Sequence, residues 1–224
     1  MPFGIYPHIL YNTAFISTLR NYHLKSIFFL LLLTAALFGD KEYSIRAAYG
    51  TSSASDLDEL YTFQGLNPSP YDTSVYVIGG GYLLSRDFYG LPFDFYIKSD
   101  VSYFDENGYQ SNFFEAVLYI KMFYNIDLFG NRVRIGFGEG VSYADKVPWV
   151  EHMEAVAESD NESNFLNYLD VTVDFNLGKA FGTKVLDDYY IGYLIKHRSG
   201  FHGTYGGVKD GGSNYNSIYL EKNF

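Results

Sequence analysis

Apolar and polar residues alternate along most of the chain after residue 40. In residues 91–105, Phe93 and Phe95 share one parity with other apolar side chains, while Lys98 and Asp100 occupy the opposite parity. A period of two is typical of a β-strand, because successive side chains point to opposite faces of the sheet. The pattern therefore predicts strands rather than helices.

Eight runs of this kind follow one another, and they are 9 to 17 residues long. Strands of a soluble sandwich are about 5–6 residues long, whereas about 9–11 tilted residues cross a bilayer. An even number of long strands can close on itself. We therefore predict an all-β fold, an eight-stranded antiparallel transmembrane β-barrel of the outer-membrane type. The predicted strands are residues 42–50, 73–87, 91–105, 112–128, 131–145, 165–180, 186–199 and 214–224.

The connections between these runs alternate in length. They are short near 88–90, 129–130 and 181–185, and long at 51–72, 146–164 and 200–213. In outer-membrane barrels the short turns are periplasmic and the long loops extracellular. The apolar parity should then face lipid, and the charged parity should form a paired polar core without a solute channel. The charged residues expected in this core are Asp94, Lys98, Asp100, Arg132, Arg134, Asp174, Lys196 and Arg198.

The first 39 residues differ in character from the rest. The apolar run from Ile27 to Phe38 follows Lys25 and ends at Gly39, before a charged segment. This run is shorter than the ~18 residues of a spanning helix, and the order of regions is that of a cleaved secretory signal peptide. We expect residues 1–39 to be a leader, with a start codon downstream of residues 1–23, and residues 40–224 to form the barrel in the bacterial outer membrane.

Composition and charge remove several function classes. The chain has 16 Lys and Arg against 26 Asp and Glu, a formal charge of −10, which argues against nucleic acid as a partner. It contains no Cys, so thiolate sites and Cys nucleophiles are excluded. The acidic segment 151–162 is interpreted as a solvated loop, and Gly79–Gly81 as a bend or a place where a bulky neighbour packs. We expect no metal and no cofactor.

One histidine has a setting that suggests chemistry. The apolar parity of the seventh run includes Ile191, Tyr193 and Ile195, so His197 and Ser199 fall on the same outer face at its extracellular end. Residues i and i+2 of a strand have Cα atoms about 6.5–7 Å apart, which allows an imidazole to act as general base for a hydroxyl. The alternative is a rim histidine beside an ordinary serine.

The segment Lys196-His197-Arg198-Ser199-Gly200, a Gly-rich loop, residues 210–216 (DGGSNYN) and a final strand resemble the end of the lipid A 3-O-deacylase (PagL-type) family. Members of that family are eight-stranded outer-membrane barrels that hydrolyse an ester-linked acyl chain with a Ser-His-acid triad on the outer wall. The resemblance implies that Ser199 is the nucleophile and His197 the base.

The same resemblance places the remaining site residues. Asn216 stands at the position of the family's acid, and Asp210 in the preceding loop is a substitute. Gly200 stands where the family usually has Asn, which leaves a backbone N–H for the oxyanion hole, and Asn214 could supply an amide. Asn can orient an imidazole, although it stabilises the imidazolium less than a carboxylate does.

The sequence thus favours a lipid A deacylase, a serine esterase whose partners are lipopolysaccharide and outer-membrane lipids. The alternative is a non-catalytic small barrel whose loops 51–72 and 146–164 are structural or adhesive. An acyltransferase that binds its substrate in the lumen ranks third, because the charged interior parity leaves no apolar slot. The sequence does not determine which acyl chain is removed or whether the protein forms a homodimer.

Overall fold

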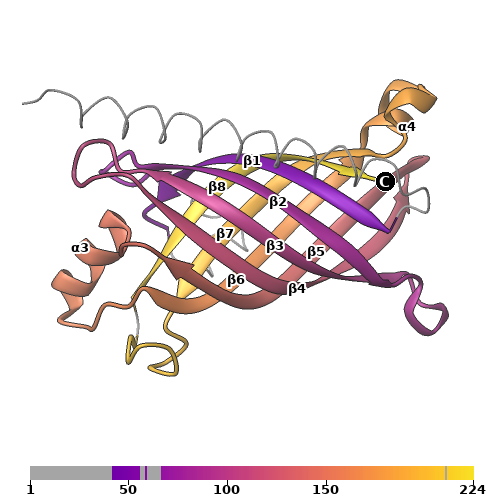
Figure 1. The fold of residues 1–224 in the computed structure, drawn as a ribbon. Coiled ribbons are helices and arrows are strands. Elements are labelled where there is room, and N and C mark those ends of the chain that lie inside the picture. The colour runs from indigo at the N-terminus through magenta and orange to yellow at the C-terminus, as the bar shows by residue number, and fades with distance from the viewer. Residues whose placement is uncertain (1–41, 56–58, 60–66, 210) are drawn as a thin grey trace, which may run out of the picture. The chain divides into compact units, whose positions relative to one another are not determined.

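The computed structural model describes residues 42–55, 59, 67–209 and 211–224. The predicted leader and Asp210 lie outside the described residues. Eight strands form one closed antiparallel barrel in which each strand pairs with the next and β8 pairs with β1 (Figure 1). The predicted eight-stranded fold is confirmed. The strands are β1 (Tyr43–Ser53), β2 (Ser74–Ser85), β3 (Phe93–Asp105), β4 (Phe113–Leu128), β5 (Asn131–Ala144), β6 (Phe165–Asn176), β7 (Tyr189–Ser199) and β8 (Gly212–Asn223).

The predicted strand bounds agree with the structure to within three residues, except at the end of β6. There the short helix α4 (Leu177–Phe181) begins, where the alternation predicted a strand to residue 180. The Asn176 side chain accepts a hydrogen bond from Lys179 N at 2.8 Å and caps this helix. Gly182, with φ of 65°, ends it. Two short 3₁₀ turns lie at this end: η2 (Lys184–Leu186) follows α4 in the same connection, and η1 (Phe88–Gly90) lies between β2 and β3.

The connection between β5 and β6 contains a helix, α3 (Trp149–Glu158), which lies at the opposite end of the barrel from α4 (Figure 1). The interpretation of residues 151–162 as a solvated loop is wrong for residues 151–158, which belong to this helix, whereas Ser159, Asn161 and Glu162 after it are exposed. Glu151 is buried, accepts a hydrogen bond from Ser213 Oγ at 2.6 Å, and pairs with Arg198 at 3.2 Å. These two contacts dock the helix on the rim of the barrel.

Within the part of the chain that the structure describes, no helix has the length and apolarity needed to cross a membrane.

The outer wall of the barrel is apolar. Large aliphatic and aromatic side chains are exposed on alternate positions of the strands, whereas the positions between them are buried. An apolar exterior around a polar interior is the arrangement of a barrel that spans the bacterial outer membrane, where the exterior contacts lipid. Exposed members of this wall include Tyr49, Tyr76, Ile78, Val101, Leu118, Ile120, Ile135, Phe137, Val173, Ile218 and Leu220.

Ion pairs fill much of the interior, as the charged parity predicts, and a buried apolar cluster lies beside them, made of Val75, Val77, Phe104, Phe113, Ala144 and Tyr215. Most of the predicted core residues are among the buried groups, and Arg46, Glu115, Lys121, Asp170 and Glu221 join them. The buried pairs of the described residues contain six cations and six carboxylates. These are Arg46, Lys98, Lys121, Arg134, Lys196 and Arg198 with Asp100, Glu115, Glu151, Asp170, Asp174 and Glu221.

Arg46 lies at the centre of this network. Its guanidinium pairs with Asp100 at 2.5 Å and with Asp170 at 2.7 Å, and it donates to Tyr119 Oη at 2.7 Å. Lys121 pairs with the same Asp170 carboxylate. Arg46 on β1 therefore connects strands on several sides of the barrel through one side chain.

The glycines of β2 make room for this network. A Cβ at Gly79 would collide with the Asp100 carboxylate, and a Cβ at Gly81 would lie 2.7 Å from Lys98 Cγ. The interpretation of Gly79–Gly81 as a place where bulky neighbours pack is confirmed.

Two predicted core residues lie near the end of the barrel that carries α4. Arg132 is 41% exposed and pairs with exposed Asp127 at 3.2 Å, so its placement in the buried core was wrong. The alternation identified its parity but not its depth, because it is the second residue of β5. Asp94 is half-buried and accepts a hydrogen bond from Asn125 Nδ2 at 2.9 Å.

Replacing Arg46 by Ala leaves two buried carboxylates without their shared partner. We expect the free energy of unfolding to fall by about 3–5 kcal/mol. Arg132→Ala removes only an exposed pair and should cost less than about 1 kcal/mol. Urea titration of the barrel in detergent micelles, followed by heat-modifiable gel mobility, measures both. Equal decreases in the free energy of unfolding for the two variants would contradict a structural role for the ion pairs of Arg46.

The pH dependence of α3 docking follows from Glu151. Burial raises the pKa of Glu151 to about 6, against the lowering effect of Arg198. Because the docked state holds the proton more tightly than the undocked state, this contribution to docking is complete below the ordinary value of 4.5. The stabilisation of the docked helix by protonated Glu151 is lost as the pH rises through about 6. The loss in the free energy of docking is about 2 kcal/mol.

Hydrogen exchange of residues 149–158 should therefore be slower at pH 5 than at pH 7, after correction for the intrinsic exchange rates. Glu151→Gln should abolish the difference. A difference that persists in Glu151→Gln would assign the effect to another group.

Candidate functional site

Ion pairs in the lumen determine which β7 side chains point inward and which point outward. Lys196 and Arg198 point inward, where both pair with Glu115, Lys196 at 2.5 Å and Arg198 at 3.4 Å. Because strand side chains alternate, His197 and Ser199 must point to the outer wall. The structure therefore places both residues on the outward-facing parity, as predicted from the sequence.

His197 is held by a neighbouring strand. It is 9% exposed, and its register partner on β8 is Asn214. His197 Nδ1 and Asn214 Oδ1 are 2.7 Å apart, while Asn214 Nδ2 donates to Ser55 O at 3.0 Å. Since the amide nitrogen is engaged with a carbonyl, the amide oxygen faces the imidazole and can only accept. Nδ1 therefore carries the proton, which leaves the lone pair of Nε2 free to take a proton.

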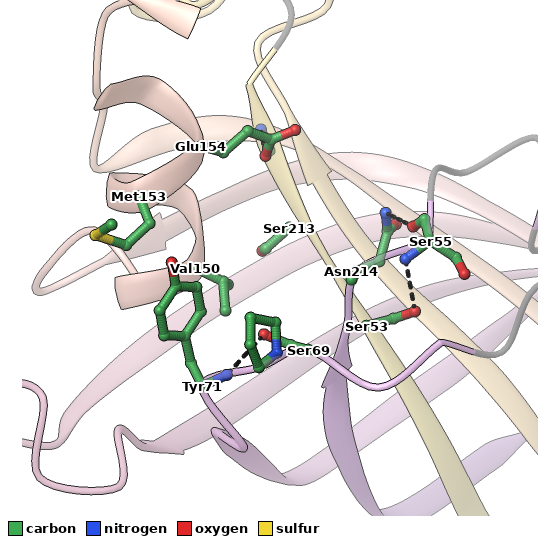
Figure 2. Close-up of a pocket in the computed structure, with 12 residues that line it drawn as sticks. Ser53, Ser55, Ser69, Tyr71, Val150, Met153, Glu154, Ser213 and Asn214 are labelled. Carbon is green, nitrogen blue, oxygen red and sulfur yellow. Dashed lines mark hydrogen bonds between the residues drawn. The ribbon is translucent and has the colours of Figure 1, made fainter. Parts of the chain in front are cut away.

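Asn214 also lines a pocket of about 260 Å³ at the rim, between the end of β1, α3 and the start of β8. Figure 2 shows the bond from Asn214 to Ser55 and the bond from Ser55 N to Ser53 Oγ, which is 3.1 Å long. These contacts fix the segment after β1. The bond from Asn214 Nδ2 to Ser55 O, on the pocket side, thus holds in place the Asn214 amide whose oxygen contacts His197.

Asn216, the residue that the resemblance places at the acid position, is engaged elsewhere. Its Oδ1 accepts a hydrogen bond from Tyr193 Oη at 2.6 Å. The register pairs Asn216 with Ile195, whereas His197 pairs with Asn214. The structure therefore brings Asn214, and not Asn216, into contact with the imidazole.

Ser199 is half-buried and lies between two register partners, Asn167 on β6 and Gly212 on β8. Gly200 follows Ser199 and packs closely against Val208, since a Cβ at residue 200 would lie 1.9 Å from Val208 O. Residue 200 can therefore offer its backbone N–H but no side chain.

Asn167 is a polar residue of this wall that sequence reasoning missed. It shares the outward parity of Leu169 and Val171 and is only 2% exposed. The available signal was the parity of β6 combined with the pairing of β6 and β7, which brings Asn167 opposite Ser199. Alternation within one strand shows which face a residue lies on, but it does not show which residue of the adjacent strand lies opposite.

A groove of about 430 Å³ runs over the outer wall beside Asn167. Asn167 and Tyr205 line it together with Val141 of β5, and apolar side chains of three strands line the rest. The exposed side chain of Glu139 also lies along it. The other lining residues are Phe95, Ile120, Met122, Phe137 and Gly140.

The described ranges hold no group of three or more His, Asp or Glu side chains placed to bind a metal ion.

Neither a protein-family model nor a curated protein matches the sequence. Among solved structures, the barrel is similar to that of the outer membrane enzyme PagL, with a TM-score of 0.54 and 11% identity, over 81% of this chain and 99% of that chain. The likeness is one of fold.

Two further solved structures match at lower scores. Neisserial surface protein A (NspA) gives a TM-score of 0.48 at 15% identity, over 83% of this chain and 98% of that one. The N-terminal β-barrel domain of Pseudomonas aeruginosa OprF gives 0.42 at 10% identity, over 84% and 100%.

Proposed function

We propose that this protein is a serine esterase that removes an ester-linked acyl chain from lipid A in the outer leaflet. One observation carries the proposal. His197 and Ser199 lie two residues apart on the outer wall, and Asn214 holds the imidazole with Nδ1 protonated. An outward-facing base in the correct tautomer next to a hydroxyl is the arrangement of nucleophilic acyl transfer.

The chemistry follows from these groups. His197 Nε2 takes the Ser199 hydroxyl proton as Oγ bonds to the ester carbonyl carbon. The tetrahedral intermediate collapses when the C–O bond to the sugar breaks, and the imidazolium returns the proton to the leaving oxygen. His197 then deprotonates a water molecule as it attacks the carbonyl carbon of the acyl-serine. The bond from that carbon to Ser199 Oγ breaks, the imidazolium returns the proton to Oγ, and the fatty acid is released. The Asn214 amide orients the imidazole in both halves.

The position of the pair supports a lipid substrate. The two side chains lie on the wall that contacts lipid, at the end of β7 that precedes the connection 200–211. Buried ion pairs occupy much of the lumen, and charged side chains are a poor environment for an acyl chain. A lipid of the outer leaflet reaches the site laterally. Lipopolysaccharide is the lipid of that leaflet, and the resemblance of residues 196–224 to the deacylase family supports lipid A.

A non-catalytic barrel is the second candidate. The observation that favours it is the neutral Asn214 amide at the imidazole, where a carboxylate would stabilise the imidazolium more strongly. In that case His197 and Ser199 would be rim residues, and the extracellular segments with α3 would carry the function.

Ser199→Ala and His197→Ala separate the two candidates. Each should reduce release of fatty acid from purified lipid A in detergent micelles at least about 1000-fold, because nucleophile and base act as a unit. Heat-modifiable mobility should stay unchanged, since both side chains lie outside the ion-pair network. Ser74→Ala, at the corresponding end of β2, is the matched control and should keep wild-type activity.

Mass spectrometry of lipid A from cells with and without the protein identifies the chain removed. Lipid A of the same mass in both strains, together with no release by the purified protein, would refute the esterase and leave the non-catalytic barrel.

The two asparagines of β8 should differ in effect. Asn214→Leu removes the acceptor of the Nδ1 proton, so kcat should fall about 10- to 100-fold as the imidazole loses its fixed orientation. Asn216→Leu removes only the bond to Tyr193 and should lower kcat less than about threefold. Initial rates on lipid A measure both. A larger loss for Asn216→Leu would return the orienting role to Asn216.

A further inference from the structure

The Asn167 amide is buried without a use in the fold. Among the described residues, Asn167 Nδ2 has no hydrogen-bond partner, and the residue is 2% exposed. Asn164, three residues earlier, shows the contrast, since its Nδ2 donates to Ala144 O at 2.7 Å. A buried unpaired donor costs stability, and such groups in native proteins call for a specific explanation.

The register places this donor beside the nucleophile. Asn167 and Ser199 are directly paired across β6 and β7, and both face outward. Cβ atoms of directly opposed residues lie about 4.5–5.5 Å apart. An amide nitrogen, two bonds beyond its Cβ, can therefore come within about 3 Å of an oxygen on a carbon bonded to Ser199 Oγ, which is the geometry of an oxyanion donor.

The residue after the nucleophile cannot supply a side-chain donor in this chain. A Cβ at Gly200 would overlap Val208 O, which is a backbone atom and cannot move aside as a side chain can. A side-chain amide aimed at the oxyanion must then come from a neighbouring strand. Ser199 has two strand neighbours, Asn167 and Gly212, and only Asn167 carries an amide side chain.

We infer that Asn167 is a catalytic residue that donates Nδ2–H to the oxyanion formed when Ser199 attacks the ester, an inference that rests on the proposed function. As the Oγ–C bond forms and the proton passes to His197 Nε2, the carbonyl π electrons move onto oxygen. Asn167 Nδ2–H and the backbone N–H of Gly200 donate hydrogen bonds to that oxyanion. The interaction ends when the charge returns to carbon and the sugar oxygen leaves.

The groove gives this inference a place for the substrate tail. Asn167 and Tyr205 line one part of it, and Val141, Phe137 and Met122 line it further along the wall. A carbonyl at Asn167 therefore leaves the attached acyl chain beside an apolar channel. The Tyr205 ring, in the connection after β7, packs on Phe165 with 5.8 Å between the ring centroids.

Two substitutions at Asn167 test the inference on purified protein in detergent micelles with lipid A. Asn167→Leu keeps the shape but removes the donor, and Asn167→Asp replaces it by an acceptor. Each should lower kcat about 100- to 1000-fold with little change in KM. The urea midpoint of Asn167→Leu should equal or exceed that of the wild type, because no hydrogen bond is lost.

Asn164→Leu is the matched control. It breaks the bond to Ala144 O, so its urea midpoint should fall while kcat stays within about threefold of wild type. Wild-type kcat in Asn167→Leu, with Ser199→Ala inactive, overturns the role of Asn167 and leaves the esterase standing. A fall in midpoint for Asn167→Leu that matches Asn164→Leu overturns it too, because Asn167 would then be structural. Wild-type protein that releases no fatty acid, and whose Ser199 does not react with a fluorophosphonate, overturns both proposals.

Discussion

The buried ion pairs of the lumen determine which way seven of the eight strands face, and β2 contributes glycines that make room for them. A slip of one residue in a strand that carries such charges would move them into lipid and its apolar side chains into the interior. Arg46, paired with Asp100 and Asp170, shows how strongly this is enforced, because one guanidinium holds carboxylates from two other strands. Register is therefore specified from inside the barrel.

The ion-pair network also determines which side chains lie on the outer wall. Lys196 and Arg198 are fixed to Glu115, and the residues between and after them must face lipid. The neighbours of His197 and Ser199 then follow from register alone, with Asn214 on one side and Asn167 on the other. A site on the wall of a barrel needs no cavity of its own, because strand pairing sets the spacing of its groups.

The period of two was enough to predict the barrel, its apolar exterior and the outward placement of His197 and Ser199. It could not rank positions by depth, which is why Arg132 was assigned to the core although it lies at a strand end. It also could not detect α3, whose Glu151 is buried by a contact with Arg198 distant in sequence. Asn214 and Asn216 share one parity, and only the pairing of β7 with β8 shows which of them meets the imidazole.

The bond from Asn214 to Ser55 crosses the seam where the last strand of the barrel meets the first. The contacts among β6, β7 and β8 can form within successive hairpins while the chain is still an open sheet. The amide that selects the histidine tautomer, however, is fixed only when residues at the end of β1 arrive beside β8. Closure of the barrel and orientation of the His197 imidazole are therefore one event, and an incompletely assembled chain carries His197 and Ser199 without an oriented imidazole.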